Sequence, residues 1–198
     1  MVAAIADEMP EVRAIWEAGG RHCELGCGVG GQLFGRLALF SRLTSVGVDM
    51  DGALLEQARQ TAVRLGVADR VALRHIDARE LRNDAAFDTL QWSQFFFPVE
   101  SRAATLAVIY RALRPGGYLL VPLPRSAPGS ADQLHSPAGR TSAVNQLVFG
   151  CWGIVWQNDD QVRAEVEGAG FTILRLSSRE VGSRQMLARR PLFRLHPG

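Results

Sequence analysis

The chain lacks lysine, because all 22 of its Lys and Arg positions are arginines. Enzymes that form a Schiff base through a lysine, such as pyridoxal enzymes and lysine-dependent aldolases, are therefore excluded. Nucleotide-binding P-loops and protein kinases are excluded as well, since both place a lysine on the phosphates of their ligand. Cofactors that are held by glycines and carboxylates remain.

Cysteine is scarce, and the three cysteines form no framework. They are Cys23, Cys27 and Cys151, an odd count that fits a reducing compartment. An iron–sulfur radical enzyme would need a third cysteine where Gly30 stands, and a zinc site would need more ligands than His22 supplies. We therefore expect packed thiols at Cys23 and Cys27 and no metal.

Long hydrophobic runs and clustered charges are also absent. No run approaches the roughly 18 apolar residues of a membrane-spanning helix, and residues 1–10 carry Asp7 and Glu8 rather than the features of a secretion signal. Arginines and acids are interleaved along the chain, whose formal net charge is +2. This pattern indicates neither a nucleic-acid surface nor a membrane patch, and we expect a cytoplasmic protein.

Length and periodicity predict one domain over residues 1–198 with an α/β fold. A short helical segment occupies residues 1–20. The expected strands cover residues 22–25, 44–49, 70–76, 87–92, 118–122, 171–176 and 185–189, and the expected helices cover 10–18, 33–38, 52–65, 101–113, 143–153 and 159–168. Since the last two strands look antiparallel, the fold class is a mostly parallel seven-stranded sheet with one antiparallel strand and helices on both faces.

Two segments between these elements predict irregular structure. Residues 114–117, Arg-Pro-Gly-Gly, predict a turn after a helix. Residues 123–141 are rich in Pro, Ser, Gly and Arg without apolar periodicity. They predict a long loop, and because such loops in compact domains tend to be functional, we expect this one over the substrate site.

Three acids mark the expected ligand site. Glu24, Asp49 and Asp77 end three consecutive strands, and Glu24 runs into a glycine turn, residues 26–31. Ligands of open α/β sheets lie outside the carboxyl ends of the strands. A glycine turn lets a ligand approach backbone N–H groups, and an acid about 20 residues further on accepts ribose hydroxyls, which fits the spacing from Gly28 to Asp49.

The acid at Glu24 discriminates between nucleotide ligands. A pyrophosphate over the glycine turn would be repelled by a carboxylate two residues before Gly26, whereas an ammonium group would be attracted to it. S-Adenosylmethionine carries such an ammonium on its methionine part. Its ribose suits Asp49, and its adenine amino group can donate to Asp77.

The same residues carry a family resemblance. Residues 23–30 (Cys-Glu-Leu-Gly-Cys-Gly-Val-Gly), 46–49 (Val-Gly-Val-Asp), 77–78 (Asp-Ala), 87–88 (Phe-Asp) and 113–120 (Leu-Arg-Pro-Gly-Gly-Tyr-Leu-Leu) resemble successive motifs of class I S-adenosylmethionine-dependent methyltransferases. The resemblance extends from about residue 14 to residue 190. It implies a Rossmann-like methyltransferase fold and S-adenosylmethionine as the cofactor.

The resemblance also implies the roles of individual residues. It places the glycine turn under the methionine and ribose part, with Glu24 on the amino group. Asp49 would hold the ribose diol with Met50 on an adenine face, and Asp77 and the Ala78 N–H would meet the adenine edge. The implied cofactor-binding set is Glu24, Gly26, Cys27, Gly28, Gly30, Asp49, Met50, Asp77, Ala78, Trp92, Ser93 and Gln94, of which the last three would flank the sulfonium.

A narrower resemblance links residues 87–98 and 111–118 to actinobacterial methyltransferases of small molecules. Members of that group usually carry an extra N-terminal helical region that helps dimerise and covers the substrate. Only about twenty residues precede the first strand here, too few for such a region. The chain is therefore expected to be a minimal enzyme, a domain of a larger product, or a subunit whose lid comes from a homodimer or a partner chain.

The sequence predicts methyl transfer to a small-molecule acceptor, such as a secondary metabolite, on oxygen or nitrogen. His135 in the expected loop is the candidate general base, and Arg125 and Arg140 are candidate contacts for an acidic acceptor. One alternative is a protein that binds S-adenosylmethionine without methylating, either a regulatory subunit or an enzyme of another reaction. A nicotinamide-dependent oxidoreductase is a third hypothesis, which Glu24 disfavours because its carboxylate would repel the pyrophosphate of the cofactor.

Overall fold

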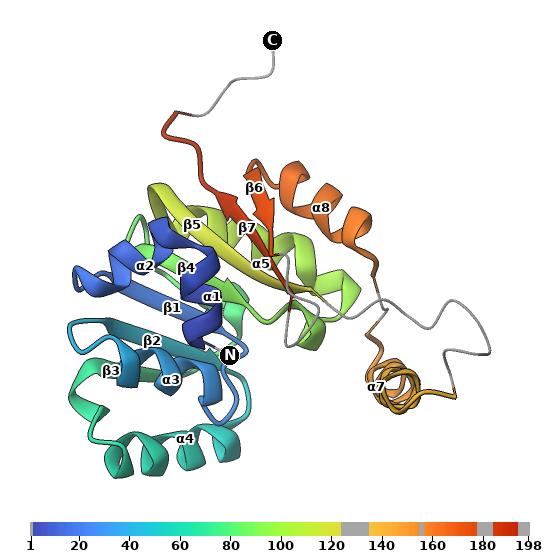
Figure 1. The fold of residues 1–198 in the computed structure, drawn as a ribbon, viewed down its shortest axis with the longest axis horizontal. Coiled ribbons are helices and arrows are strands. Elements are labelled where there is room, and N and C mark those ends of the chain that lie inside the picture. Colours follow the sequence, from blue (N-terminus) through green and yellow to red (C-terminus); the bar gives the residue numbers. More distant parts are fainter. Residues whose placement is uncertain (1, 124–134, 155–156, 178–183, 194–198) are drawn as a thin grey trace.

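The computed structural model describes residues 2–123, 135–154, 157–177 and 184–193. Within these residues seven strands form one sheet in the order β3-β2-β1-β4-β5-β7-β6 (Figure 1). The strands are β1 (Arg21–Leu25), β2 (Thr44–Asp49), β3 (Val71–His75), β4 (Phe87–Trp92), β5 (Leu113–Leu123), β6 (Thr172–Leu176) and β7 (Arg184–Arg189). Because β7 runs antiparallel to both β5 and β6 while the other paired strands are parallel, the expected fold class is confirmed.

Helices cover both faces of the sheet. Leu33 of α3 and Leu55 of α4 belong to one buried apolar cluster, and Ile109 of α5 and Val162 of α8 belong to another, so these pairs pack on opposite faces. The helices are α1 (Val2–Glu8), α2 (Pro10–Glu17), α3 (Gly31–Leu39), α4 (Gly52–Arg64), α5 (Val99–Ala112), α7 (Pro137–Cys151) and α8 (Asp159–Gly168), with short 3-10 turns η1 (Ala68–Arg70), η2 (Ala78–Glu80) and η3 (Gln94–Phe96). Among the described helices none is long and apolar enough to cross a membrane.

The N-terminal segment forms two helices rather than one. Val2, Ile5 and Ala6 of α1 are buried at the i, i+3, i+4 spacing of an amphipathic helix. In α2, the Trp16 indole Nε1 donates to Thr89 Oγ1 of β4 over 2.9 Å. This segment therefore packs onto the sheet as part of the core.

Strand β5 begins earlier than the sequence predicts. Leu113 already pairs with Phe87, and the next paired residue is Tyr118 with Thr89. The expected turn, residues 114–117, is thus an irregular stretch inside the strand, where Gly116 has a φ of +83°. The Gly116 N–H bonds to the Arg190 carbonyl over 2.9 Å, which holds this stretch in the sheet.

Helix α7 also begins earlier than expected, at Pro137 rather than at residue 143. The Ser136 hydroxyl accepts from the Gly139 N–H over 3.0 Å, an N-cap followed by proline at the first helical position. The expected loop over 123–141 is therefore wrong at both ends, since Leu123 belongs to β5, while residues 124–134 lie outside the described residues. Figure 1 shows α7 standing apart from the sheet.

Candidate cofactor site

The site lies at the carboxyl ends of the parallel strands. The strand order reverses between β1 and β4, which is the position at which open α/β sheets bind ligands. The chain leaves β1 through the glycine turn, in which Gly26, Gly28 and Gly30 have φ values of +73°, +52° and +82°. A Cβ at Gly30 would lie 2.3 Å from the Phe34 ring, so this turn needs glycine both for its φ and for the approach of α3.

Asp49 reaches from the end of β2 back to the glycine turn. Its Oδ2 accepts from the Gly28 N–H over 2.7 Å, and its Oδ1 accepts from the Asp51 N–H over 3.0 Å. The two strand ends are therefore connected through one carboxylate. This places Asp49 where the spacing in the sequence predicts a ribose acceptor.

A pocket of about 190 Å³ adjoins this carboxylate. Five of the predicted cofactor residues line it: Gly26, Asp49, Met50, Asp77 and Ala78. The other lining residues are Val48, Ile76, Arg79, Phe96, Phe97, Pro98, Glu100 and Ser101. The structure thus brings together the ends of β2 and β3, the glycine turn and the aromatic turn η3.

Asp77 lies in the pocket wall with an ion-pair partner. Its carboxylate accepts from the Arg79 N–H over 2.8 Å and from Arg79 Nη2 over 2.6 Å. These hydrogen bonds lower the pKa of Asp77, so the carboxylate stays ionised. Arg79 and Glu100 were not predicted from the sequence, although Arg79 follows Asp77 by only two residues and is within reach of its side chain.

The described lining of the pocket carries an excess of negative charge. Asp49, Asp77 and Glu100 face one cation, Arg79. A bound pyrophosphate would be repelled by this set, whereas a ligand with positive groups would be attracted. The charge of the pocket therefore favours a cationic nucleoside over a dinucleotide.

Glu24 differs from its expected setting because it is buried and paired inside the protein. Its Oε2 accepts from Arg36 Nη1 of α3 over 2.9 Å, and its Oε1 accepts from Gln91 Nε2 over 3.5 Å. Arg36 is itself fully buried and also donates to Gln91 and Gln32. Burial raises the pKa of Glu24 to about 7, against the opposing effect of Arg36. The carboxylate therefore lies beneath the glycine turn and is engaged by protein groups.

The three predicted residues at the end of β4 face inward. Trp92 is fully buried, between the Arg102 guanidinium at 4.7 Å and the Phe97 ring at 5.9 Å. Gln94 is buried too, and its Nε2 donates to the Pro122 carbonyl over 3.2 Å. Ser93 is buried next to the glycine turn, 3.5 Å from the position a Cβ would take at Gly26. These residues support the wall of the site and are absent from the described lining of the pocket.

Cys27 contributes backbone to the turn, while its thiol points into the core. Its Sγ would lie 2.9 Å from a Cβ at Gly47 of β2, and burial raises the pKa of the thiol. Cys23, Cys27 and Cys151 are all free cysteines. In the part of the chain that is described, no group of three or more His, Cys, Asp or Glu residues could hold a metal.

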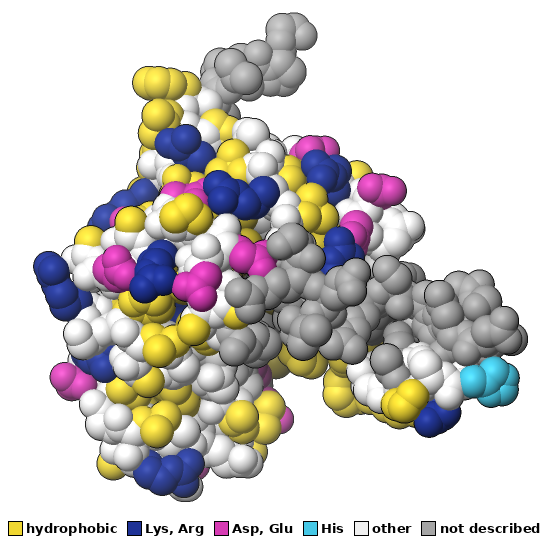
Figure 2. Space-filling model, in the orientation of Figure 1, with side chains coloured by type: hydrophobic (Ala, Val, Ile, Leu, Met, Phe, Trp, Pro, Cys, Tyr) yellow, Lys and Arg dark blue, Asp and Glu magenta, His cyan; other side chains and the backbone are white. Residues whose placement is uncertain are grey.

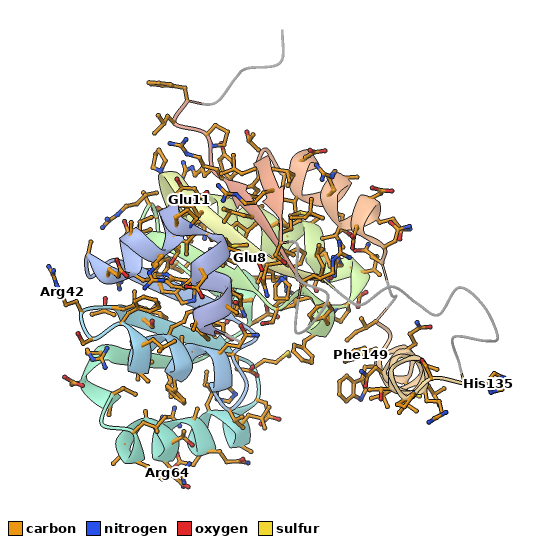
Figure 3. All side chains as sticks on the ribbon, in the orientation of Figure 1. Glu8, Glu11, Arg42, Arg64, His135 and Phe149 are labelled. Carbon is orange, nitrogen blue, oxygen red and sulfur yellow. The ribbon has the colours of Figure 1, made fainter. Side chains whose placement is uncertain are left out.

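His135 does not join the pocket. It is exposed and lies at the outer end of α7, away from the sheet (Figure 3). Its carbonyl accepts from Arg140 Nη1 over 2.5 Å, so Arg140 is also at this outer end, and Arg125 lies outside the described residues. The expected role of His135 as a base is therefore without support from the geometry.

Helix α7 contacts the aromatic side of the site through Phe149. The ring of Phe149 is 6.0 Å from that of Phe96 in the pocket wall and 5.7 Å from that of Trp152, centroid to centroid. Phe95 continues the group, 6.5 Å from Phe96. On the face shown in Figure 2, arginine and acidic side chains are interspersed.

Comparison with known proteins gives a family and a fold. Residues 23–121, half of the chain, match the family described as a methyltransferase domain. The curated protein 27-O-demethylrifamycin SV methyltransferase of Amycolatopsis mediterranei (strain S699) is 30% identical over 137 residues, which are 66% of this chain and 50% of that protein. The chain thus spans about half the length of this curated relative.

Two solved structures illustrate the fold. Mitomycin 7-O-methyltransferase MmcR is 20% identical with a TM-score of 0.71, over 96% of this chain and 60% of that one. The [4+2]-cyclase SpnF is also 20% identical, with a TM-score of 0.67, over 95% of this chain and 82% of that one. At this identity the likeness shows a shared Rossmann-like fold, and the two proteins are named for different reactions, a [4+2] cyclisation and an O-methylation.

Proposed function

The chain belongs to the family of S-adenosylmethionine-dependent methyltransferases, whose cofactor it shares, and from this premise we propose that it methylates a small-molecule acceptor on oxygen or nitrogen. The observation that carries the proposal is the pocket in which Asp49 and Asp77 meet beside the glycine turn. Its excess of carboxylates suits a ligand with a sulfonium and an ammonium group.

We propose the following placement of the cofactor on residues of this chain. The backbone of the turn formed by Gly26, Cys27, Gly28 and Gly30 would hold the methionine and ribose part, with Asp49 on the ribose hydroxyls. The adenine would meet Asp77 and the Ala78 N–H at its edge. Met50, which is 73% exposed, is free to cover one adenine face, and Phe97 would cover the other.

The four other predicted cofactor residues take supporting roles in this proposal. Glu24 would act on the amino group from beneath the glycine turn, without a direct bond, because its oxygens are held by Arg36 and Gln91. Trp92, Ser93 and Gln94 would support the wall beside the sulfonium.

The bound cofactor supplies a methyl group on a sulfonium that is already activated for in-line displacement. The task of the chain is then to align the acceptor and to exclude water. The pocket side of η3, with Phe96 and Phe97, is apolar and suits both tasks. None of the described residues that line the pocket is a histidine, and we propose that alignment contributes more here than proton removal by His135.

The nature of the acceptor is inferred from the aromatic group around Phe96 and from the relatives. Phe95, Phe96 and Phe149 form an apolar edge next to the pocket. The curated relative is named for a rifamycin derivative, and one structural neighbour is named for mitomycin. Both names support a small, partly aromatic acceptor of secondary metabolism.

We also propose a partner and a cellular location for the enzyme. Val144 and Leu147 of α7, and Trp152 directly after it, are exposed apolar side chains. They fit a homodimer or a partner chain that supplies a lid. The free cysteines support a cytoplasmic location.

A second candidate function is binding of S-adenosylmethionine without methyl transfer. The name of the cyclase neighbour shows that this fold hosts a reaction other than methylation, and the exposed position of His135 fits the same reading. Transfer of a labelled methyl group from the cofactor to any acceptor would exclude this candidate.

Calorimetry with S-adenosylmethionine, S-adenosylhomocysteine and NAD⁺ tests the cofactor part of the proposal. We expect both adenosyl ligands to bind and NAD⁺ not to bind, because the carboxylates of the pocket repel its pyrophosphate. No detectable binding of either adenosyl ligand at high micromolar concentration would contradict the proposal. Incubation with methyl-labelled cofactor and a panel of phenols and amines then tests the transfer itself.

A further inference from the structure

Arg102 of α5 is a buried arginine that joins several elements behind the pocket. Its Nη1 donates to the Gln94 carbonyl and to Gln94 Oε1, both over 2.9 Å. Its Nε and Nη2 donate to the Glu165 carboxylate of α8 over 3.0 and 2.6 Å. The guanidinium also lies over the Trp92 ring at 4.7 Å. An arginine fork with this many partners has one defined orientation.

The Gln94 end of this network connects two strand ends. Gln94 is the first residue of η3, and its Nε2 donates to the Pro122 carbonyl near the end of β5 over 3.2 Å. Both its side chain and its carbonyl are thus fixed. Because the same carbonyl accepts from the Phe97 N–H over 3.2 Å, the conformation of η3 depends on where Gln94 is held.

The Glu165 end holds the segment that precedes α8. Glu165 Oε1 accepts from Gln157 Nε2 over 2.7 Å in addition to its bonds with Arg102. The chain between Pro122 and Gln157, which contains α7, is therefore attached at both ends to partners of Arg102. Arg102 thus connects Pro122 and Gln157 indirectly, through Gln94 and Glu165.

The pocket wall adjoins this arrangement. Phe96, Phe97 and Ser101 line the pocket, and they lie between Gln94 and Arg102 in the sequence. Phe97 also packs against Trp92, with ring centroids 5.9 Å apart, and Trp92 lies under Arg102. Loss of the guanidinium would release both the turn and its packing partner.

We infer that Arg102, with Glu165, is a positioning residue that fixes the η3 wall of the cofactor pocket. This inference rests on the proposed function for its effect on ligand binding. Its effect on the wall concerns the protein alone, so the two parts are tested by separate measurements.

The first measurement is hydrogen exchange of the unliganded protein, with the Phe96 and Phe97 amides as reporters. Their N–H groups bond to the Ser93 and Gln94 carbonyls over 3.1 and 3.2 Å. In Arg102→Gln we expect at least tenfold faster exchange at both amides. Unchanged exchange at these amides would overturn the inference.

The second measurement is the affinity for S-adenosylhomocysteine by calorimetry, corrected for the folded fraction. We expect at least tenfold weaker binding for Arg102→Gln and about threefold weaker binding for the milder Glu165→Gln. Arg102→Lys should restore only part of the affinity, because an ammonium cannot replace the fork. A folded Arg102→Gln protein that binds within twofold of wild type would overturn the inference.

Arg114→Gln is the control for the loss of an ion-paired arginine away from the pocket. Arg114 and Asp88 form a 2.6 Å ion pair between β5 and β4, at the ends of these strands opposite to Pro122 and Gln94, and the Arg114 side chain is 53% exposed. We expect normal exchange at Phe96 and normal affinity in this variant, and equal losses would overturn a specific role for Arg102. Wild-type protein that binds no S-adenosylhomocysteine would refute the proposed function, while the exchange measurement would still decide the role of Arg102.

Discussion

Replacement of Asp49 by alanine is expected to weaken cofactor binding more than any other single change in the lining of the pocket. In the proposed complex its carboxylate accepts both ribose hydroxyls. Hydrogen bonds to a charged group contribute about 1.5–3 kcal/mol each, so the loss of two is expected to cost about 3 kcal/mol or more. This corresponds to a Kd that is raised about 100-fold or more.

The free protein adds a second contribution to this loss. The Asp49 carboxylate accepts the Gly28 and Asp51 N–H groups over 2.7 and 3.0 Å. Alanine removes both bonds and loosens the turn before the ligand arrives. Asparagine retains an oxygen for one of these N–H groups but lacks the charge, and we expect it to weaken binding about tenfold.

Titration of each variant with S-adenosylhomocysteine in a calorimeter, with thermal unfolding to establish the folded fraction, measures the effect. Asp51→Ala is the control. The Asp51 side chain caps α4 by accepting from the Ala53 and Leu54 N–H groups over 2.8 and 3.1 Å, so its loss should cost about 1 kcal/mol of stability without changing the affinity. An Asp49→Ala protein that binds within threefold of wild type would refute the placement of the ribose on Asp49.

Three further outcomes follow from named contacts. Burial raises the pKa of Glu24 to about 7 from 4.5, so the folded protein binds this proton more tightly than the unfolded chain does. As pH rises from 4.5 to 7, the free energy of unfolding, relative to that of Glu24→Gln, should therefore fall by up to about 3 kcal/mol. Urea titrations that show a rise over this range would contradict the prediction. Arg79→Ala removes an ion pair with Asp77 in which the arginine side chain is half exposed. The affinity for S-adenosylhomocysteine should stay within threefold of wild type or improve. A tenfold loss of affinity in calorimetry would show that Arg79 itself holds the ligand. Trp16→Phe removes the buried hydrogen bond to Thr89 and shortens the ring that faces Arg36. It should lower the free energy of unfolding by about 1–2 kcal/mol in urea, whereas an unchanged value would show that this hydrogen bond contributes little to stability.

The strand ends could be predicted from the sequence because their signals are local. Asp49 and Asp77 each stand at the end of a predicted strand, and parallel strands bring such positions to one edge of the sheet. The glycines of the first turn mark the same edge. For this reason Gly26, Asp49, Met50, Asp77 and Ala78 all line the pocket in the structure.

The setting of Glu24 could not be predicted, because it depends on a contact across the fold. Arg36 lies twelve residues later, and the two meet only when α3 packs on β1. A sequence shows that Glu24 ends a strand but does not show which side chain of the next helix lies above it.

The inward orientation of Gln94 escaped prediction for a similar reason. Its partner Arg102 lies eight residues later, on the buried side of α5 together with Thr105 and Ile109. An arginine in register with apolar helix positions is a signal of burial that could have been found. The position of His135 had no such signal, since it depends on where α7 lies.

The placement of β7 between β5 and β6 has a consequence for how the protein folds. β7 is the last strand in the chain, yet it bonds to both of these earlier strands. Until β7 has been synthesised, β5 and β6 therefore have open edges that can pair with other chains. β7 has to enter between β5 and β6, and its pairing with β5 is a long-range one, of the kind that forms slowly. A chaperone that shields strand edges would thus act on the open edges of β5 and β6 until β7 has paired with them.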